Sequence, residues 1–350
     1  MTSSSPPSPP SPPSPITNTG ATSSAPAAGG PRAASRGTAK DASEARPWTV
    51  LELLRWTTQH FASREIESAR LDAECLLAFA LGRSRLELYL DFEKPVEADA
   101  RSRFRELVRQ RGSQRIPVSQ LVGRKEFWSL SLKVSCDVLT PRPETESLVA
   151  AALAALPEHH RAYRVLDLGT GSGAVALAIA SERPAAQITA TDISYAALQI
   201  AAANADELRL RDRIGLLQGR LFAPLRPASF DLVVSNPPYL ARSVSAGLAP
   251  ELAYEPEEAL FGGDDGLAVL RPLVAQVSEV LRPGGVVAVE IDPGQAECVT
   301  AWCGQAGLEG MEIGQDLARR PRVVVARRPE SNFGGAECVR RRPAAGQGRE

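Results

Sequence analysis

The sequence lacks long apolar runs, and its cysteines, histidines and net charge give no strong functional signal. Its 350 residues include five cysteines and three histidines, and the formal net charge is -1. No stretch reaches the roughly 20 apolar residues of a transmembrane helix, and no secretory hydrophobic segment lies near the N-terminus. We therefore expect a soluble, cytoplasmic protein that does not associate with membranes.

The same scarcity argues against a metal centre and against a nucleic-acid partner. The cysteines are odd in number and lack the paired short spacing of zinc or redox sites, so we interpret them as reduced thiols. His60, His159 and His160 suit a solvated surface better than a metal site. A near-neutral chain has no overall electrostatic attraction to nucleic acid. We expect no metal and no direct nucleic-acid binding.

Composition separates the two ends from the rest of the chain. Residues 1–46 are rich in Ser, Pro and Ala and cannot bury enough apolar surface to become ordered. Residues 329–350, which contain Arg340, Arg341 and Arg342, form a basic tail of the same kind. We predict that both ends are disordered. The first forty residues contain no acid, so an organelle transit peptide is an alternative interpretation of the leader.

The central part changes its hydrophobic period twice. Residues 47–114 have helical spacing and predict a small bundle that holds a substrate or partner. Residues 115–140 alternate apolar and polar side chains and predict a β-hairpin connector. Residues 141–328 alternate strands with helices, which is typical of an open, Rossmann-like α/β sheet. The strands are expected around Val165, Ile188, Leu216, Val233, Val287, Ile313 and Val324.

A glycine loop, Gly169–Gly173, follows the predicted strand 164–168 and precedes a helical run. This layout is typical of a nucleotide-cofactor site, because glycines permit a tight turn and close approach of the backbone to a ligand. The next predicted strand ends at Asp192, at about the spacing of an acid that binds a ribose diol. NAD and S-adenosylmethionine both carry that diol, and Asp192 also suits a helix N-terminus. The loop alone leaves these alternatives open.

Asn236-Pro237-Pro238-Tyr239 follows the predicted strand 230–235. The nitrogen of an amide or exocyclic amine is a poor nucleophile, so its N–H groups need acceptors that release the lone pair. The Asn236 oxygen and the Pro237 carbonyl suit this task, because the prolines stiffen the loop and remove backbone donors. Tyr239 adds a flat face and a hydroxyl. The motif favours methyl transfer to a planar nitrogen, and hence S-adenosylmethionine over NAD; the alternative is a strand-ending turn.

Gly169, Asp192 and Asn236 each follow the end of a predicted strand. In open α/β sheets, ligands bind outside the carboxyl ends of the strands, near the point where strand order reverses. The three signals therefore predict a single site at one edge of the sheet.

Further motifs lie in the connector, at Ile116–Gly123, Glu126-Phe127 and Val138–Glu146. Together with the glycine loop and Asn236–Tyr239, they resemble the peptide chain release factor N5-glutamine methyltransferases, the PrmC or HemK family. The resemblance extends over about residues 50–328. It implies a class I (Rossmann-like) methyltransferase sheet preceded by the bundle and the hairpin. A sister family methylates a ribosomal-protein glutamine, but the sequence after the Pro-Arg pair is closer to the release factor group.

The resemblance implies transfer of a methyl group from S-adenosyl-L-methionine to the glutamine side-chain amide nitrogen in the Gly-Gly-Gln motif of class 1 release factors. Asn236, Pro237 and Tyr239 would be catalytic, and Pro238 would complete the substrate-binding loop. We also expect a monomer. The residues expected at the cofactor are Gly169, Thr170, Gly171, Ser172, Gly173, Asp192, Leu221 and Asn236.

Two segments depart from the usual family sequence, and one pair of charged residues in the connector has an open role. Gly219-Arg220 stands where the family often has an acid before the Leu-Phe pair, so adenine contacts are expected to differ. Glu290–Gln295 departs from the usual Glu-Ile-Gly, in a loop expected to lie too far from Asn236 to affect the chemistry. Arg142 and Glu144 are expected to form an ion pair that fixes the connector over the cofactor; the alternative is contact with the substrate.

Other functions compete with this interpretation. An amino-methyltransferase of nucleic-acid bases uses the same Asn-Pro-Pro-Tyr logic on a flipped base, but the neutral charge argues against it. A ribosomal-protein glutamine is another possible substrate. A catalytically idle adaptor would have no need for Gly169, Asp192 and Asn236 together.

Overall fold

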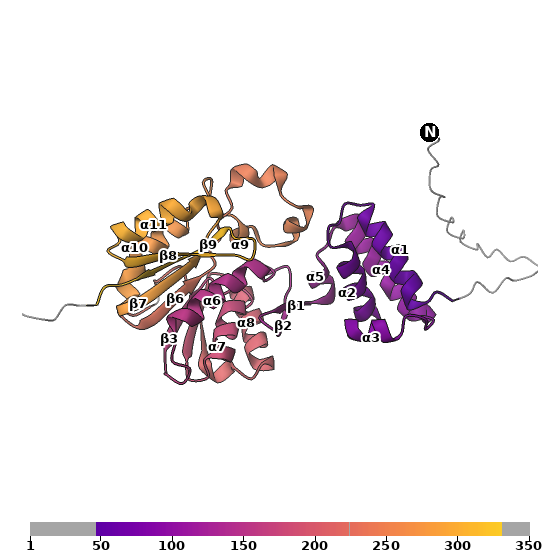
Figure 1. The fold of residues 1–350 in the computed structure, drawn as a ribbon, viewed down its shortest axis with the longest axis horizontal. Helices are drawn as coiled ribbons and strands as arrows, with labels where there is room; N and C mark the ends of the chain where they lie inside the picture. The colour runs from indigo at the N-terminus through magenta and orange to yellow at the C-terminus, as the bar shows by residue number, and fades with distance from the viewer. Residues whose placement is uncertain (1–46, 224, 331–350) are drawn as a thin grey trace, which may run out of the picture. The chain divides into compact units, whose positions relative to one another are not determined.

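The computed structural model describes residues 47–223 and 225–330. The predicted leader and all but the first two residues of the predicted basic tail lie outside these ranges. Within them, the chain forms a helical bundle, a β-hairpin and a seven-stranded sheet with helices on both faces (Figure 1).

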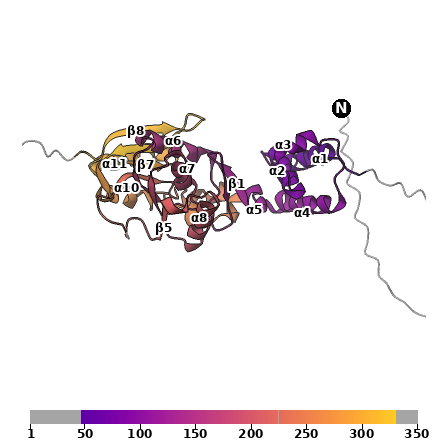
Figure 2. The ribbon, with the colours of Figure 1, turned by 90° about the horizontal axis from the view of Figure 1, so that it is seen from below.

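Four helices form the N-terminal bundle, and Figure 2 shows α1, α2 and α4 next to one another. The helices are α1 (Val50–Ala62), α2 (Ala69–Leu81), α3 (Arg85–Leu90) and α4 (Ala98–Gln114). Leu54, Phe61 and Leu76 have no exposed surface, because the helical period turns them to a common interior. Thr49 begins α1 with a capping box that involves Glu52. None of the described helices is long and apolar enough to cross a bilayer.

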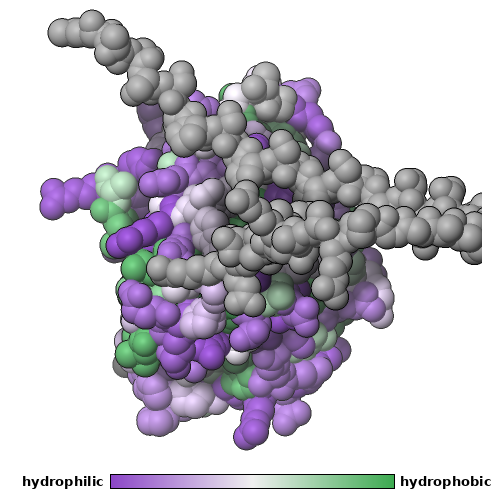
Figure 3. Space-filling view, turned by 90° about the vertical axis from the view of Figure 1, so that its right-hand side faces the viewer, coloured by the Kyte–Doolittle hydropathy of each residue, from purple (hydrophilic) through white to green (hydrophobic). Residues whose placement is uncertain are grey.

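The surface of the bundle carries some exposed apolar side chains. Leu86 and Leu90 of α3 are 73% and 77% exposed. In Figure 3, the hydrophobic side chains that the grey atoms leave visible lie in small groups among hydrophilic ones. Apolar atoms make up a large share of any protein surface, so small groups of this kind are ordinary.

The connector contains the predicted β-hairpin, formed by β1 (Arg124–Phe127) and β2 (Leu130–Lys133). The alternating pattern did not predict the short helix α5 (Val118–Val122), which Gly123 ends in a left-handed conformation. The hairpin turn places Trp128 and Ser129 at positive φ, which is unusual for non-glycine residues. Two hydrogen bonds hold Trp128, from its backbone N–H to Glu146 at 3.0 Å and from its indole N–H to Glu182 at 2.9 Å.

All seven predicted strands are present, in the order β5-β4-β3-β6-β7-β9-β8. The first five strands of that order are parallel, and β9 is antiparallel to both of its neighbours. This confirms the predicted α/β fold class. The strands are β3 (Arg164–Leu168), β4 (Gln187–Asp192), β5 (Ile214–Gln218), β6 (Phe230–Ser235), β7 (Leu281–Glu290), β8 (Glu309–Gln315) and β9 (Pro321–Arg327).

Helices cover the two faces of the sheet because side chains alternate along each strand. Leu232 and Val234 of β6 join a core with α6 and α7, whereas Val233 joins a second core with α10 and α11. The chain order of the strands reverses between β3 and β6. Loops that follow these two strands therefore lie side by side. The covering helices are α6 (Glu146–Ala155), α7 (Ala174–Glu182), α8 (Tyr195–Glu207), α10 (Leu270–Val280) and α11 (Ala296–Gln305).

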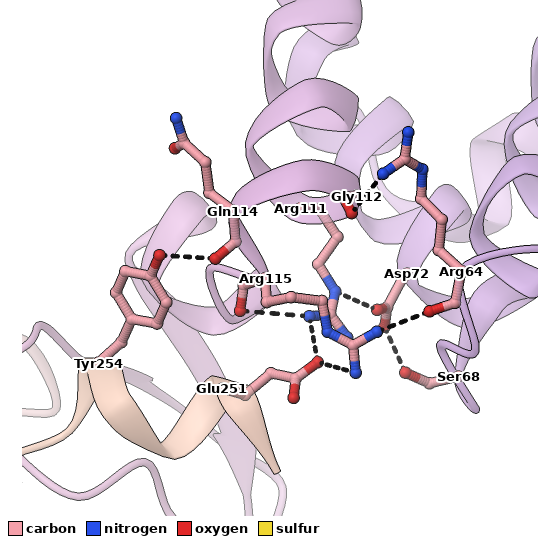
Figure 4. A network of polar contacts seen from close by, with 9 residues as sticks. All are labelled: Arg64, Ser68, Asp72, Arg111, Gly112, Gln114, Arg115, Glu251 and Tyr254. Atoms are coloured by element: carbon pink, nitrogen blue, oxygen red, sulfur yellow. Dashed lines mark hydrogen bonds and ion pairs between the residues drawn. The ribbon is translucent and has the colours of Figure 1, made fainter.

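Residues 242–260, here called the 242–260 segment, follow the Asn-Pro-Pro-Tyr loop and reach the bundle. The segment contains η3 (Arg242–Gly247), η4 (Pro250–Tyr254) and α9 (Glu257–Leu260). Figure 4 shows Glu251 facing two guanidinium groups, with Arg111 at 2.7 Å and Arg115 at 2.9 Å. Arg111 also binds Asp72 of α2 at 2.7 Å. The Tyr254 hydroxyl donates to the Gln114 carbonyl at 2.6 Å, so η4 is attached to the end of α4 at two points.

We predict that Arg111→Met lowers the free energy of unfolding by about 3 kcal/mol, the lower end of the range for breaking a buried ion pair. Arg111 is 6% exposed, and its loss leaves Asp72 without its cation, whereas Glu251 keeps Arg115. Urea unfolding followed by circular dichroism measures the change. Arg109→Met is the control, because Arg109 pairs with Glu106 on the exposed surface and should leave the transition in place. Superimposable curves for both variants would contradict the prediction.

Candidate functional site

A cavity of about 420 Å³ opens at the carboxyl ends of β3, β4 and β6. Its volume is in the range of small-ligand sites. Most of the predicted site residues line it, namely Gly169, Thr170, Gly171, Ser172, Asp192, Leu221, Asn236, Pro237 and Pro238. Gly173 and Tyr239 are not among the lining residues. The structure thus brings the three sequence signals to one cavity and leaves two of the predicted residues behind its wall.

The glycines of the loop have different structural roles. Gly169 and Gly171 have φ of +74° and +55°, and a Cβ on either would meet no atom within 4 Å. Their backbone therefore borders open space where a ligand can approach closely. A Cβ on Gly173 would lie 3.1 Å from Leu177 and 3.2 Å from Ala201, so this glycine lets the start of α7 lie close to Ala201 of α8.

Carboxylates on both sides of the glycine loop hold its shape. Asp192 accepts hydrogen bonds from the N–H groups of Gly171 and Ser194, both at 2.9 Å. Asp167 lies beneath the loop and accepts from the Thr170 hydroxyl at 2.6 Å. Burial raises the pKa of Asp167 to about 6. Asp192 lines the cavity while it orients the loop, and it is the Ser194 side chain, not Asp192, that caps α8.

Asn204 of α8 is a supporting residue that the sequence did not reveal. It is 1% exposed, and its amide donates to the carbonyl of Ser172 at 2.9 Å. The same side chain exchanges two hydrogen bonds with the backbone of Lys133 in the hairpin. Because Ser172 belongs to the glycine loop, Asn204 joins the hairpin to the floor of the cavity.

The Asn236 side chain is fixed at one end. Its Nδ2 donates to the Thr145 hydroxyl oxygen at 3.1 Å. Within residues 47–223 and 225–330, no hydrogen bond uses its Oδ1. Since Asn236 lines the cavity, this oxygen is an acceptor that a bound group can use.

Tyr239 turns toward the protein interior. Its hydroxyl donates to Oε1 of Glu290 at 3.2 Å, and its ring packs against the core between the sheet and α10. Burial, followed by the nearby Glu290 carboxylate, raises the pKa of Tyr239 far above its usual value. Tyr239 is therefore a neutral hydroxyl behind the cavity wall.

Two glycines and Gln295 support the Asn-Pro-Pro-Tyr loop from outside. A Cβ on Gly262 would lie 2.4 Å from the Pro238 carbonyl oxygen, and one on Gly266 would lie 2.4 Å from that of Tyr239. Gln295 Nε2 donates to the Tyr239 carbonyl at 3.0 Å. The loop that contains Gln295 was expected to lie apart from the site chemistry, but it contacts the motif directly.

The ion pair predicted for Arg142 has a different partner in the structure. Arg142 pairs with Glu255 of the 242–260 segment at 2.5 Å, not with Glu144 as expected. The Glu255 side chain is 1% exposed, so this pair anchors the segment that supplies Pro256 to the cavity wall.

Leu221 lines the cavity at φ +49°, which is rare for a bulky residue and typical of strained functional positions.

Family models and individual relatives of known function agree with one another. The family model "PrmC N-terminal domain" matches residues 52–123, and "Methyltransferase small domain" matches residues 148–263. The release factor glutamine methyltransferase of Rhodopirellula baltica is 44% identical over 284 residues, which cover 79% of this chain and 96% of that protein. The protein of the same name from Xylella fastidiosa is 46% identical over 268 residues, with 77% and 96% covered.

Among the solved structures similar to this chain is a release factor-specific protein-(glutamine-N5) methyltransferase from Alicyclobacillus acidocaldarius. It is 28% identical, and the similarity covers 54% of this chain and 94% of that chain with a TM-score of 0.34.

We predict that Gly262→Ala destabilises the protein by about 1 to 3 kcal/mol, because the new methyl group overlaps two backbone oxygens. Those oxygens belong to Pro238 and Gly266, at 2.4 and 2.5 Å. Chemical denaturation measures the change. Gly304→Ala in α11 is the matched control, since its Cβ meets only Met311 at 3.9 Å, and alanine there should stabilise the helix. A Gly262→Ala variant as stable as the wild type would show that the loop does not depend on this contact.

Proposed function

Because this chain belongs to the release factor glutamine methyltransferase family, we propose that it transfers a methyl group from S-adenosyl-L-methionine to a release factor glutamine. The acceptor is the side-chain amide nitrogen of the glutamine in the Gly-Gly-Gln motif of class 1 release factors. The observation that carries the proposal is the position of Asn236 on the wall of the cavity that the glycine loop and Asp192 also line.

The residues around the glycine loop fit S-adenosyl-L-methionine. The open space beside Gly169 and Gly171 accepts a ligand at backbone distance, and the Asp192 carboxylate suits the two ribose hydroxyls. Leu221 offers an apolar wall to the adenine. When bound, the cofactor supplies a methyl group on a positively charged sulfur. That methyl group is already activated, so the protein contributes mainly by orienting the acceptor.

The acceptor nitrogen is held by the Asn-Pro-Pro-Tyr loop. Asn236 Oδ1 accepts one N–H of the substrate amide, and the Pro237 carbonyl accepts the other. As the nitrogen gains positive charge during transfer, both hydrogen bonds strengthen, which is preferential binding of the transition state. The proton becomes acidic after transfer and leaves to water. The catalytic contribution of Tyr239 is to support the loop, since its hydroxyl is bound to Glu290.

The bundle and the 242–260 segment contribute the protein-binding surface. Residues of α2, α4, α5 and the segment line a second cavity of about 900 Å³, which includes Arg83, Arg85, Glu65 and Glu67. A groove with both signs of charge suits a folded protein partner better than a nucleic acid. We propose a monomeric enzyme that acts in the cytoplasm without binding nucleic acid directly.

We predict that the full-length protein methylates a bacterial class 1 release factor in the presence of S-adenosyl-L-methionine. Mass spectrometry of the digested release factor should locate one added methyl group on the glutamine of the Gly-Gly-Gln motif. A release factor in which that glutamine is replaced by alanine is the control. If the wild-type release factor stays unmodified while a ribosomal protein or nucleic acid gains methyl groups in a cell extract, the proposed substrate is wrong.

Asn236→Ala should lower kcat by about 100-fold or more, the usual effect of removing one preorganised group that stabilises the transition state. Binding of S-adenosyl-L-methionine, measured by calorimetry, should be retained because Asp192 and the glycine loop are untouched. Gln305→Ala, which removes an exposed amide at the end of α11, should leave kcat unchanged. Full turnover by Asn236→Ala would contradict the assigned role of this amide.

A further inference from the structure

A buried carboxyl group lies behind the Asn-Pro-Pro-Tyr loop. Glu290, the last residue of β7, has no exposed surface and accepts the Tyr239 hydroxyl on Oε1. Its Oε2 has no hydrogen-bond partner in the described part of the chain. A buried, unpaired carboxylate oxygen costs free energy, so its presence beside the site calls for a functional explanation.

The groups that face this carboxyl come from three elements. Thr145 and Glu144 belong to η1 (Pro143–Thr145), Tyr239 to the loop after β6, and Arg322 to β9. Arg322 is held by Asp316 at 3.2 Å. The Thr145 hydroxyl lowers the pKa of Glu290, as a donor beside a carboxylate does, and no hydrogen bond to Oε2 is formed within the described residues.

The Thr145 hydroxyl can both donate and accept hydrogen bonds. The direction of its O–H bond decides which end of the Asn236 amide faces it. Its oxygen accepts from Asn236 Nδ2, so its own proton must point to another acceptor. Glu290 is the carboxyl group that faces it. Without that acceptor, the Thr145 proton can point to Asn236 instead. The amide then turns over, and its NH₂ group faces the N–H groups of the substrate.

We infer that Glu290 is a positioning residue for methyl transfer, acting through the hydroxyls of Thr145 and Tyr239 to direct Asn236 Oδ1 at the acceptor amide. The inference rests on the proposed function and adds Thr145, which lines the cavity, and Glu290, which lies behind it. Neither Glu290 nor Tyr239 lines the cavity.

The titration of Glu290 makes the inference testable. Burial raises its pKa to about 7, against the opposing effects of Thr145, Tyr239 and Arg322. Below that pH the carboxyl holds a proton and is a weaker acceptor for the Tyr239 and Thr145 hydroxyls, so kcat should fall as the pH is lowered through about 7. The folded state binds this proton more tightly than the unfolded state, so the same change in pH favours folding through this group. A fall in kcat on acidification would therefore not reflect unfolding caused by Glu290.

The first test compares Thr145→Val with Thr145→Ser in the full chain. Removal of the hydroxyl should lower kcat by about 10- to 100-fold, the effect of a small misplacement of a reacting group. The KM for the release factor and the Kd for S-adenosyl-L-methionine should change little, and Thr145→Ser should restore turnover. Thr57→Val is the matched control, because Thr57 is a fully buried hydroxyl of α1 that has no hydrogen-bond partner in the described residues.

The second test measures kcat against pH for the wild type and for Glu290→Gln. The variant should lose the inflection near pH 7 and turn over about tenfold more slowly at pH 8. If Thr145→Val is fully active, or if Glu290→Gln keeps the wild-type profile, the inference is overturned. If Glu290→Gln fails to fold, the comparison of Thr145→Val with Thr145→Ser tests the inference by itself. A wild type that never methylates a release factor would refute the proposed function instead, so the two failures are distinguishable.

Discussion

The parallel pairing of β3 with β6 is the constraint on which the site depends. The register pairs Leu168 with Ser235, so both strands end at the same level of the sheet. The Ser235 hydroxyl donates to the Leu168 carbonyl at 2.7 Å and joins the two ends beyond the backbone ladder. The glycine loop leaves one strand and Asn236 leaves the other. A shift of one residue in this register would turn every side chain of β6 to the opposite face and separate the two loops.

The Asn-Pro-Pro-Tyr loop keeps its shape through contacts with backbone and with buried polar groups. The prolines limit its dihedral angles, but they also remove the N–H groups that would otherwise anchor it. Gly262 and Gly266 compensate by allowing backbone to approach backbone, and Gln295 supplies a side-chain donor to the Tyr239 carbonyl. The loop is thus held on its protein side, while Asn236, Pro237 and Pro238 face the cavity.

The bundle is connected to the cavity through the 242–260 segment. Glu251 binds the arginines at the end of α4, and Glu255, four residues later, binds Arg142 beside the cavity. Pro256 then contributes to the cavity wall. Because the anchors are only a few residues apart, a partner that displaces Glu251 would act on the wall through a short, ordered stretch of backbone.

Local patterns in the sequence were sufficient to determine the fold class, the seven strands and the glycine loop. Strand periodicity depends on neighbouring residues, and Gly169, Asp192 and Asn236 are recognisable because each follows a strand end. The tertiary structure alone decided which residues support them. Thr145 and Asn236 are 91 residues apart along the chain, and Arg111 and Glu251 are 140 apart. The inward orientation of Tyr239 and the pairing of Arg142 with Glu255 were likewise decided by the tertiary structure. These contacts arise from packing between distant segments, for which no spacing in the sequence provides a signal.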